Sequence, residues 1–250
     1  MPLSERAIRA ANSLKSVGRR RARRSIVNAA ASVSACRSER EGRTYRPDID
    51  GLRALAVIPV LLFHGGVTAV PGGFVGVDVF FVISGYLITA RIMAERDASG
   101  RIDVAQFWLR RVQRLAPALV VVLLATLLMA PFLLARVSGE TGRLARAAIA
   151  TILINANHFA LAEMGDYFGE LAETNPLLHM WSLAVEEQFY LLWPLLLLGL
   201  TSRHESRRKP LVVTGLLMAS FGAACYWTAT NASWAFYLMP ARAWELLVGA

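Results

Sequence analysis

Apolar runs long enough to cross a bilayer recur along most of this chain and constrain its fold more than any other feature. Hydrophobic residues make up 55% of the 250 residues. A spanning helix needs about twenty predominantly apolar residues. Runs near this length lie at 52–70, 74–92, 115–135, 144–161, 178–200, 211–229 and from Ala235 onward. The sequence therefore predicts an all-α, polytopic transmembrane helical bundle rather than a soluble domain.

The N-terminal tail, residues 1–47, is strongly basic and holds the entire formal charge excess of +9. Beside a first span, such a tail is typical of a cytoplasmic segment that touches anionic membrane lipid. Nucleic-acid binding and a secretion signal with a lipid-attachment cysteine at Cys36 are the weaker interpretations. We predict a disordered cytoplasmic tail over 1–47, a membrane domain over 48–250 and no nucleic-acid partner.

Charges between the apolar runs predict the orientation of the spans. The arginine-rich segment 91–114 and the basic segment 201–210 should be cytoplasmic, whereas the acidic segment 162–177 should be external. An odd number of crossings must then separate 91–114 from 162–177, yet two apolar runs lie between them. Either the polar run 144–161 is re-entrant or interfacial, or the charge rule fails at one segment.

The run that begins at Ala235 stops before it is long enough to cross a bilayer. We therefore expect a truncated chain that holds about six to seven helices. The two cysteines, Cys36 and Cys225, have neither metal-binding nor redox spacing, so we predict no metal site.

Arg53 and His64 need the first explanation, because ionisable groups inside a span are costly and usually functional. Eleven residues advance a helix by three turns plus about 20°, so the two side chains share one face, roughly 16 Å apart along the axis. The arginine could hold an anionic group while the histidine does acid–base or nucleophilic work on it. Equally, Arg53 could snorkel to lipid phosphate and His64 could bond between helices.

Polar residues also enter the next two runs. The second run contains Asp78, Ser84 and Tyr86. The third opens on Arg110, Arg111 and Arg114. These arginines either enforce topology or suit the phosphates of a cytoplasmic donor.

The segment HMWSLAVEEQFYLLWP is the most costly one for a membrane to hold. His179 and Glu186 lie nearly two turns apart on one helix face, with Glu187 on an adjacent flank. Acidic residues in a span normally face a cavity or a partner. Glu186 could pair with Arg242, or Arg242 could instead pair locally with Glu245.

Five segments, in this order, resemble the membrane domain of the acyltransferase 3 family of bacterial O-acyltransferases. They are DGLRALAVIPVLLFH, GGFVGVDVFFVISGYLIT, FWLRRVQRLAP, NPLLHMWSLAVEEQFYLLWP and RAWELLVGA. The likeness runs from about Tyr45 to the last residue. It is greatest for the subgroup in which an SGNH-hydrolase-like extracytoplasmic domain follows the membrane domain.

The resemblance implies a domain of about ten helices that moves an acyl group, usually acetyl from cytoplasmic acetyl-CoA, to a sugar hydroxyl. The family's Arg-x10-His pattern falls on Arg53 and His64, and the histidine is its presumed catalytic residue. Its basic pattern falls on Arg111 and Arg114, candidate contacts for coenzyme A phosphates, with Arg110 beside them.

The family's Ser-Leu-x-x-Glu-x-x-Phe-Tyr pattern falls on Ser182, Leu183, Glu186, Phe189 and Tyr190. We predict His64, Glu186 and Arg53 as catalytic residues. The further site candidates are Asp78, Ser84, Tyr86, His179, Ser182 and Arg242.

The predicted function is O-acylation of a cell-surface or exported glycan from acetyl-CoA, without a metal, at the bacterial cytoplasmic (inner) membrane. Lipopolysaccharide, peptidoglycan and capsule are all possible acceptors. An SGNH domain is the expected partner in a longer chain. The alternatives are a transporter or channel whose charged residues line a substrate or proton path, and an inactive truncated homologue.

Overall fold

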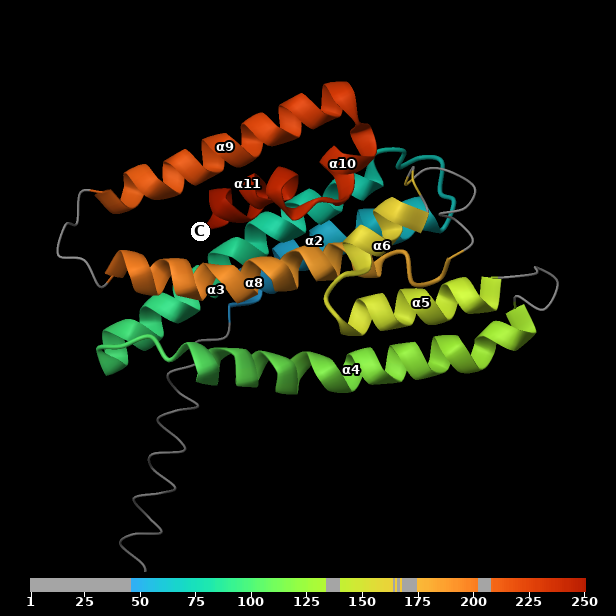
Figure 1. The fold of residues 1–250 in the computed structure, drawn as a ribbon, viewed down its shortest axis with the longest axis horizontal. Coiled ribbons are helices and arrows are strands. Elements are labelled where there is room, and N and C mark those ends of the chain that lie inside the picture. The colour runs from blue at the N-terminus through green and yellow to red at the C-terminus, as the bar shows by residue number, and fades with distance from the viewer. Residues whose placement is uncertain (1–45, 134–139, 164, 166, 168–174, 202–207) are drawn as a thin grey trace, which may run out of the picture. The chain divides into compact units, whose positions relative to one another are not determined.

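The computed structural model describes residues 46–133, 140–163, 165, 167, 175–201 and 208–250. Within these residues every regular element is helical (Figure 1), which confirms the all-α class. The predicted tail lies outside the described residues up to Tyr45. Residues 51–250 form one compact unit, and residues 46–50 belong to a separate N-terminal one, in which Arg46 pairs with Asp48 at 2.7 Å.

Long helices run back and forth along residues 51–250. They are α2 (Pro47–His64), α3 (Gly76–Ser99), α4 (Val104–Leu133), α8 (Met180–Thr201) and α9 (Arg208–Thr230). Among the described residues, four segments are long and apolar enough to cross a membrane: Gly73–Ser99, Val104–Phe132, Met180–Leu200 and Lys209–Thr230. These four agree with predicted runs, with boundaries displaced by several residues.

The predicted apolar run 144–161 is not a single helix. It is divided between α5 (Glu140–Ile152) and α6 (Ala156–Glu163). The 13 residues of α5 extend about 20 Å, which is short of a bilayer core of about 30 Å. Ile154, at the break, has a φ of 57°, an unusual value for a β-branched residue. In Figure 1, α5 runs back beside α4 and α6 returns toward the end from which α5 came, so this hairpin matches the re-entrant interpretation.

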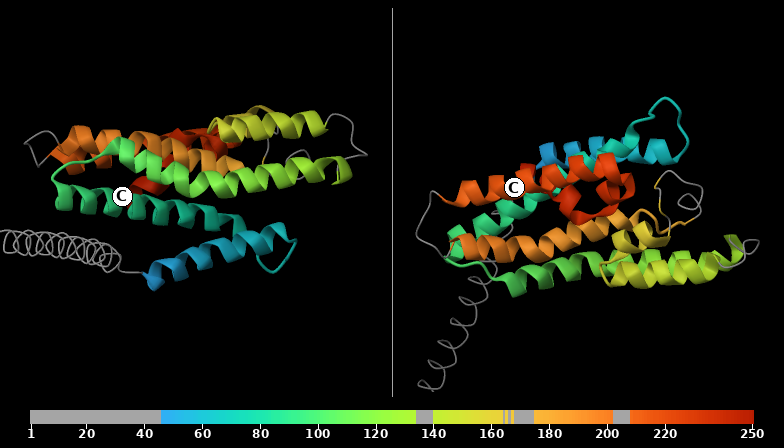
Figure 2. Two further views of the ribbon diagram at one scale, coloured as in Figure 1. Left: turned by 90° about the horizontal axis from the view of Figure 1, so that it is seen from below. Right: turned by 45° about the horizontal axis from the view of Figure 1, so that its top comes forward.

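The last apolar run is likewise divided, into α10 (Ala232–Tyr237) and α11 (Met239–Gly249), at the extended residue Leu238. Ser220 of α9 holds the start of α11, because its hydroxyl donates to the Pro240 carbonyl (2.6 Å) and accepts from the Trp244 amide (2.8 Å). From there α11 packs against both α9 and α3 (Figure 1). Figure 2 shows in two further views that α2, in blue, lies along one side of the bundle.

Two glycines allow α3 and α11 to approach closely. A Cβ on Gly85 would overlap the Leu246 backbone, and one on Gly249 would overlap the Val82 backbone. Small residues at a helix contact let the two backbones meet, which is the usual packing device inside membranes.

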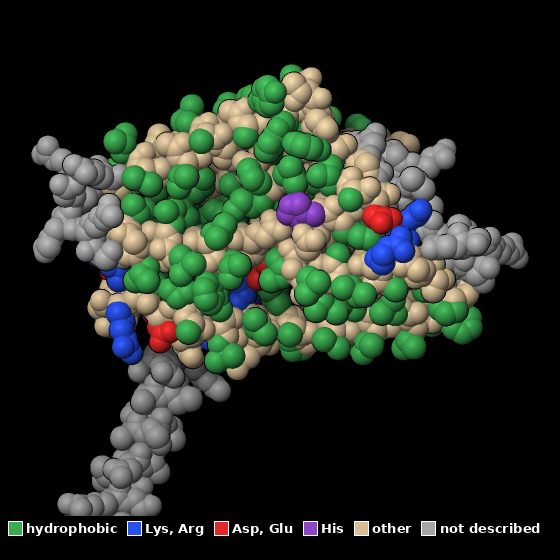
Figure 3. Space-filling model, viewed as in Figure 1, with side chains coloured by type: hydrophobic (Ala, Val, Ile, Leu, Met, Phe, Trp, Pro, Cys, Tyr) green, Lys and Arg blue, Asp and Glu red, His purple; other side chains and the backbone are tan. Residues whose placement is uncertain are grey.

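The core lies between α3, α8, α10 and α11 and is largely aromatic. Buried residues make up 39% of the spanning window of α3 and 44% of that of α8, against 11% for α4 and 6% for α9. Figure 3 shows apolar side chains spread over one face of the molecule. We therefore assign α3 and α8 to the centre of the bundle, and the outer faces of α4 and α9 to contact with lipid.

Candidate active site

A cavity of about 460 Å³, lined by charged as well as apolar side chains, lies between α2, α3, α4 and α8. Several of the predicted site residues line it: Arg53, Ser84, Arg111, Arg114, Ser182 and Glu186. Tyr190 and Arg91 also line it. The structure therefore brings together side chains from four helices that lie far apart in the sequence.

Arg111 is the electrostatic centre of this cavity. Its Nε donates to Glu187 Oε1 at 2.8 Å, and a terminal nitrogen lies 3.7 Å from Glu186 Oε1. Its guanidinium also lies 3.4 Å from the centre of the Tyr190 ring, and the Tyr190 hydroxyl donates to Glu186. One arginine thus neutralises two adjacent carboxylates, and this arrangement fixes α4 against α8.

The other two predicted donor arginines differ from Arg111 and from each other. Arg110 forms an ion pair with Glu95 and lines only a small cleft beside the main cavity. Arg114 lines both spaces, and within the described residues it forms no ion pair. Arg114 is therefore the guanidinium best available to an anionic ligand.

His64, the last residue of α2, lies outside the lining of this cavity and has its own hydrogen bonds. Its Nδ1 lies 2.8 Å from the Val60 carbonyl oxygen, and its Nε2 lies 2.7 Å from the Tyr167 hydroxyl. Because a carbonyl only accepts, Nδ1 must be the protonated nitrogen. In the neutral imidazole, Nε2 then accepts a hydrogen bond from Tyr167.

A second histidine lies against the first. The His64 and His179 ring centres are 4.4 Å apart. Burial lowers the pKa of His179, and a charge on His64 lowers that pKa further. Burial raises the pKa of the Tyr167 hydroxyl, so Tyr167 keeps its proton and can donate it to His64. The pair of histidines therefore resists holding two protons at once.

The start of α8 connects the histidine pair to the arginine-lined cavity. Ser182 lines the cavity, and its hydroxyl donates to the His179 carbonyl at 3.1 Å. At the other end of α2, Arg53 lies in the same cavity, with its guanidinium 5.4 Å from the centre of the Phe80 ring. The two predicted residues of α2 therefore lie at different ends of one site.

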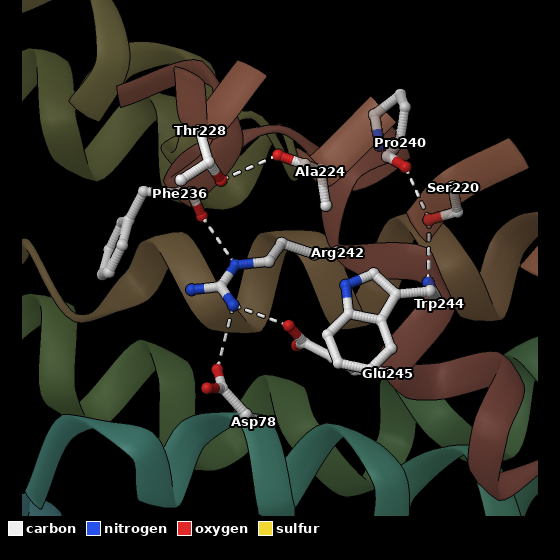
Figure 4. A network of polar contacts seen from close by, with 9 residues as sticks. All are labelled: Asp78, Ser220, Ala224, Thr228, Phe236, Pro240, Arg242, Trp244 and Glu245. Carbon is white, nitrogen blue, oxygen red and sulfur yellow. Dashed lines mark hydrogen bonds and ion pairs between the residues drawn. The ribbon is translucent and has the colours of Figure 1, made fainter. Parts of the chain in front are cut away.

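Asp78 and Arg242 belong to a separate cluster (Figure 4). One terminal nitrogen of Arg242, Nη1, lies 3.0 Å from Asp78 Oδ1 and 2.6 Å from Glu245 Oε1. The structure thus contains the local Arg242–Glu245 pair, and Glu186 pairs with Arg111 instead. Tyr86 does not line the cavity and is exposed.

Tyr167 is the site residue that sequence reasoning missed. It lies 103 positions from His64, within the acidic segment that separates two predicted spans. No spacing rule connects the two residues; the only available signal was an aromatic residue with a hydroxyl in that segment. Among the described residues, no group of three or more His, Cys, Asp or Glu side chains could hold a metal ion.

Comparison with known proteins adds the family context. A family model described as an acyltransferase domain, of the acyltransferase 3 type, matches residues 46–250. A peptidoglycan O-acetyltransferase, OatA, of Listeria monocytogenes is 38% identical over 220 residues, which are 85% of this chain and 34% of that protein. The O-acetyltransferase OatA of Staphylococcus aureus is 38% identical over 211 residues, 82% of this chain and 34% of that protein. The chain thus spans about a third of the length of these relatives. No solved structure matches.

Proposed function

We propose that this chain, which belongs to the acyltransferase 3 family, acts in a membrane-bound O-acetyltransferase that transfers acetyl from cytoplasmic acetyl-CoA to a hydroxyl of cell-wall glycan. The observation that carries the proposal is the two-part site, in which the start of α8 joins an arginine-lined cavity to a hydrogen-bonded histidine. The names of the relatives support acetyl as the group and peptidoglycan as the acceptor class.

The arginine-lined cavity supports binding of acetyl-CoA from the cytoplasm. The positive-inside rule assigns the segment 91–114 to the cytoplasmic side, and this segment supplies Arg111 and Arg114. Coenzyme A carries several phosphates, and guanidinium groups bind phosphate with a rigid fork of donors. In this proposal Arg114 and Arg53 contact the donor, while Arg111 holds Glu186 and Glu187 in place.

At the other end of the site, His64 supports the chemistry of acetyl transfer. Its Nε2 can attack the thioester carbonyl and expel the thiolate of coenzyme A; the acceptor hydroxyl then takes the acetyl group from the imidazole, and its proton passes to the thiolate. Alternatively, Nε2 takes the proton of an acceptor hydroxyl as that oxygen attacks the thioester directly, and the imidazole passes this proton to the departing thiolate. In both routes the Tyr167 hydroxyl moves from Nε2 to the thioester carbonyl oxygen, where it stabilises the negative charge that develops during the reaction.

The acceptor reaches this end from outside the cell in our proposal. His64 lies near Tyr167, which belongs to the acidic segment that the charge rule makes external. The same assignment supports a cytoplasmic N-terminus, and the bacterial relatives support location in the bacterial cytoplasmic membrane. Glu186 has Tyr190 and Arg111 as partners, so we assign it to the donor cavity rather than to proton transfer with His64.

The test uses the protein in sealed vesicles with acetyl-labelled acetyl-CoA supplied on the side of segment 91–114 and peptidoglycan on the other. We expect label on the glycan, and a loss of roughly 10²- to 10⁴-fold with His64→Ala, the usual contribution of an acid–base residue. His158→Ala is the matched control, because His158 is exposed and bonds Asn157 instead.

Normal labelling by a folded His64→Ala protein would refute the catalytic role of His64. Label recovered as free solute, with none on glycan, would favour the transporter alternative. Failure of the parent protein to label glycan, while it still binds coenzyme A, would leave a binding protein without transferase activity.

A further inference from the structure

Arg242 lies beside the break that divides the last apolar run into α10 and α11 (Figure 4). The break at Leu238 leaves carbonyl groups at the end of α10 without their usual helical partners. Arg242 Nε donates to one of them, the Phe236 carbonyl, at 3.0 Å. The same guanidinium binds Asp78 of α3 and Glu245 of α11. A single side chain therefore fixes three helices relative to one another.

The aromatic ring of Phe236 continues from this cluster toward the candidate active site. Its centre lies 4.4 Å from that of Tyr167, with the planes tilted by 31°, and 4.6 Å from that of Trp181. Tyr167 in turn presents its hydroxyl to His64 Nε2 at 2.7 Å. The contacts run without a gap from Arg242 through Phe236 and Tyr167 to the imidazole.

The chemistry of this cluster requires arginine. The Arg242 side chain is 14% exposed and that of Glu245 is 2% exposed, so water screens their charges little. Lysine would keep the charge, but a single ammonium lacks the planar fork that serves a carbonyl and two carboxylates together. Exchange of Arg242 for lysine therefore preserves the positive charge but removes the planar set of hydrogen-bond donors.

We propose that Arg242 is a positioning residue for His64, because it sets the place of Phe236 and so holds the Tyr167 hydroxyl on Nε2. The inference rests on the proposed function for its catalytic consequence, whereas the geometry is testable without any acetyl transfer. Asp78 and Glu245 are the two anions that hold Arg242.

The experiment measures the rate at which diethyl pyrocarbonate modifies each histidine of the membrane-embedded protein, resolved by peptide mass spectrometry. The reagent attacks an unprotonated imidazole nitrogen that is free of a hydrogen bond. We expect His64 to react about five- to tenfold faster in Arg242→Lys and in Phe236→Leu, the factor expected when one neutral hydrogen bond is lost. His158, which is exposed and bonds Asn157, is the internal reference.

Two further variants separate positioning from general damage. Phe236→Tyr keeps the aromatic ring and should keep the parent rate at His64. Arg146→Ala breaks an exposed pair with Glu163 and should also leave His64 unchanged. Folding is checked by thermal unfolding in detergent; if Arg242→Lys does not fold, Asp78→Asn, which removes one of the two anions that hold Arg242, carries the test and should also speed modification of His64.

Acetyl transfer supplies the second measurement. We expect kcat to fall up to about fivefold in Phe236→Leu, with KM for acetyl-CoA unchanged and full recovery in Phe236→Tyr. A parent rate of His64 modification in folded Arg242→Lys, or in folded Phe236→Leu, overturns the inference. Faster modification in a protein with no acetyl transfer would support the positioning role and refute the proposed function, so the two failures are distinguishable.

Discussion

The two ends of the candidate site hold their functional groups by different forces. At the arginine-lined end, Arg111 is fixed by two carboxylates and by the face of Tyr190. At the histidine end, His64 is held by two single hydrogen bonds and by aromatic packing behind Tyr167. Ion pairs in a buried cavity provide fixed charge for a charged donor, whereas single hydrogen bonds leave the imidazole free to exchange partners during a reaction.

Two helices serve both ends. The helix α2 carries Arg53 in the cavity and His64 at its last residue, and α8 begins beside His179 and continues to Glu186. A helix is rigid over this length, so the distance between donor anchor and histidine is set by backbone geometry rather than by side-chain contacts. The comparison predicts that changes at one end alter different kinetic constants from changes at the other.

The largest effect is expected from Arg111→Ala. The substitution leaves Glu186 and Glu187 close together without their cation, which costs about 3–5 kcal/mol for a buried pair that loses one partner. Thermal unfolding in detergent should show the loss. Arg111→Ala combined with Glu187→Gln should recover part of it, because one of the two unpaired charges is then removed. A double variant no more stable than the single one would contradict the role given to Arg111.

A smaller effect, on donor binding alone, is expected from Arg114→Ala. Arg114 is exposed within the cavity, so its removal should raise KM for acetyl-CoA about tenfold, at the lower limit for hydrogen bonds to a charged group. The parent KM should rise with ionic strength more steeply than that of the variant. Arg146→Ala is the matched control, because Arg146 is exposed and does not line the cavity. An unchanged KM for acetyl-CoA together with a reduced kcat would show that Arg114 acts at the histidine end and not in donor binding.

The sequence predicted the long helices because an apolar run of that length is stable in lipid without contacts from other parts of the chain. It failed at 144–161 and after Ala235, where short helices are stabilised by contacts with other parts of the chain. The hairpin of α5 and α6 is held by Gln188, which donates to the Ile154 carbonyl and to Asn157. Such contacts are absent from any local window of sequence, so composition alone left open whether 144–161 crosses the membrane or is re-entrant.

The site residues divide in the same way, into those that a local sequence pattern predicts and those that depend on contacts between distant segments. The arginines and Glu186 were found because charge inside an apolar run is visible in the sequence. Their partners, such as Tyr190 for Glu186, follow partly from helical spacing. Tyr167 and Phe236 were not found, because they act through ring contacts between distant segments. Side chains that position a catalytic group by packing carry no charge pattern that a sequence can reveal.

Tyr167→Phe tests the histidine end. The ring and its packing stay, while the hydrogen bond to His64 Nε2 is lost. We expect kcat for acetyl transfer to fall about fivefold, the effect of a neutral hydrogen bond of about 1 kcal/mol, with KM for acetyl-CoA unchanged. Initial rates over a range of donor concentrations separate the two constants. A rise in KM with no change in kcat would remove the functional distinction between the two ends.

The smallest expected effect is a dependence of stability on pH at the histidine end, to which Arg114 should contribute nothing because arginine stays charged throughout the accessible range. The pKa of His179 is lowered in the folded protein, first by burial and then by His64. Below the unfolded pKa of about 6.5, the unfolded chain therefore binds more protons than the folded one, and stability decreases as the pH falls. Thermal unfolding at pH 7.5 and pH 5.5 should show a smaller decrease for His179→Gln than for the parent, whereas Arg114→Ala should keep the parent's decrease. An equal decrease in all three proteins would mean that the pH dependence originates outside the histidine pair.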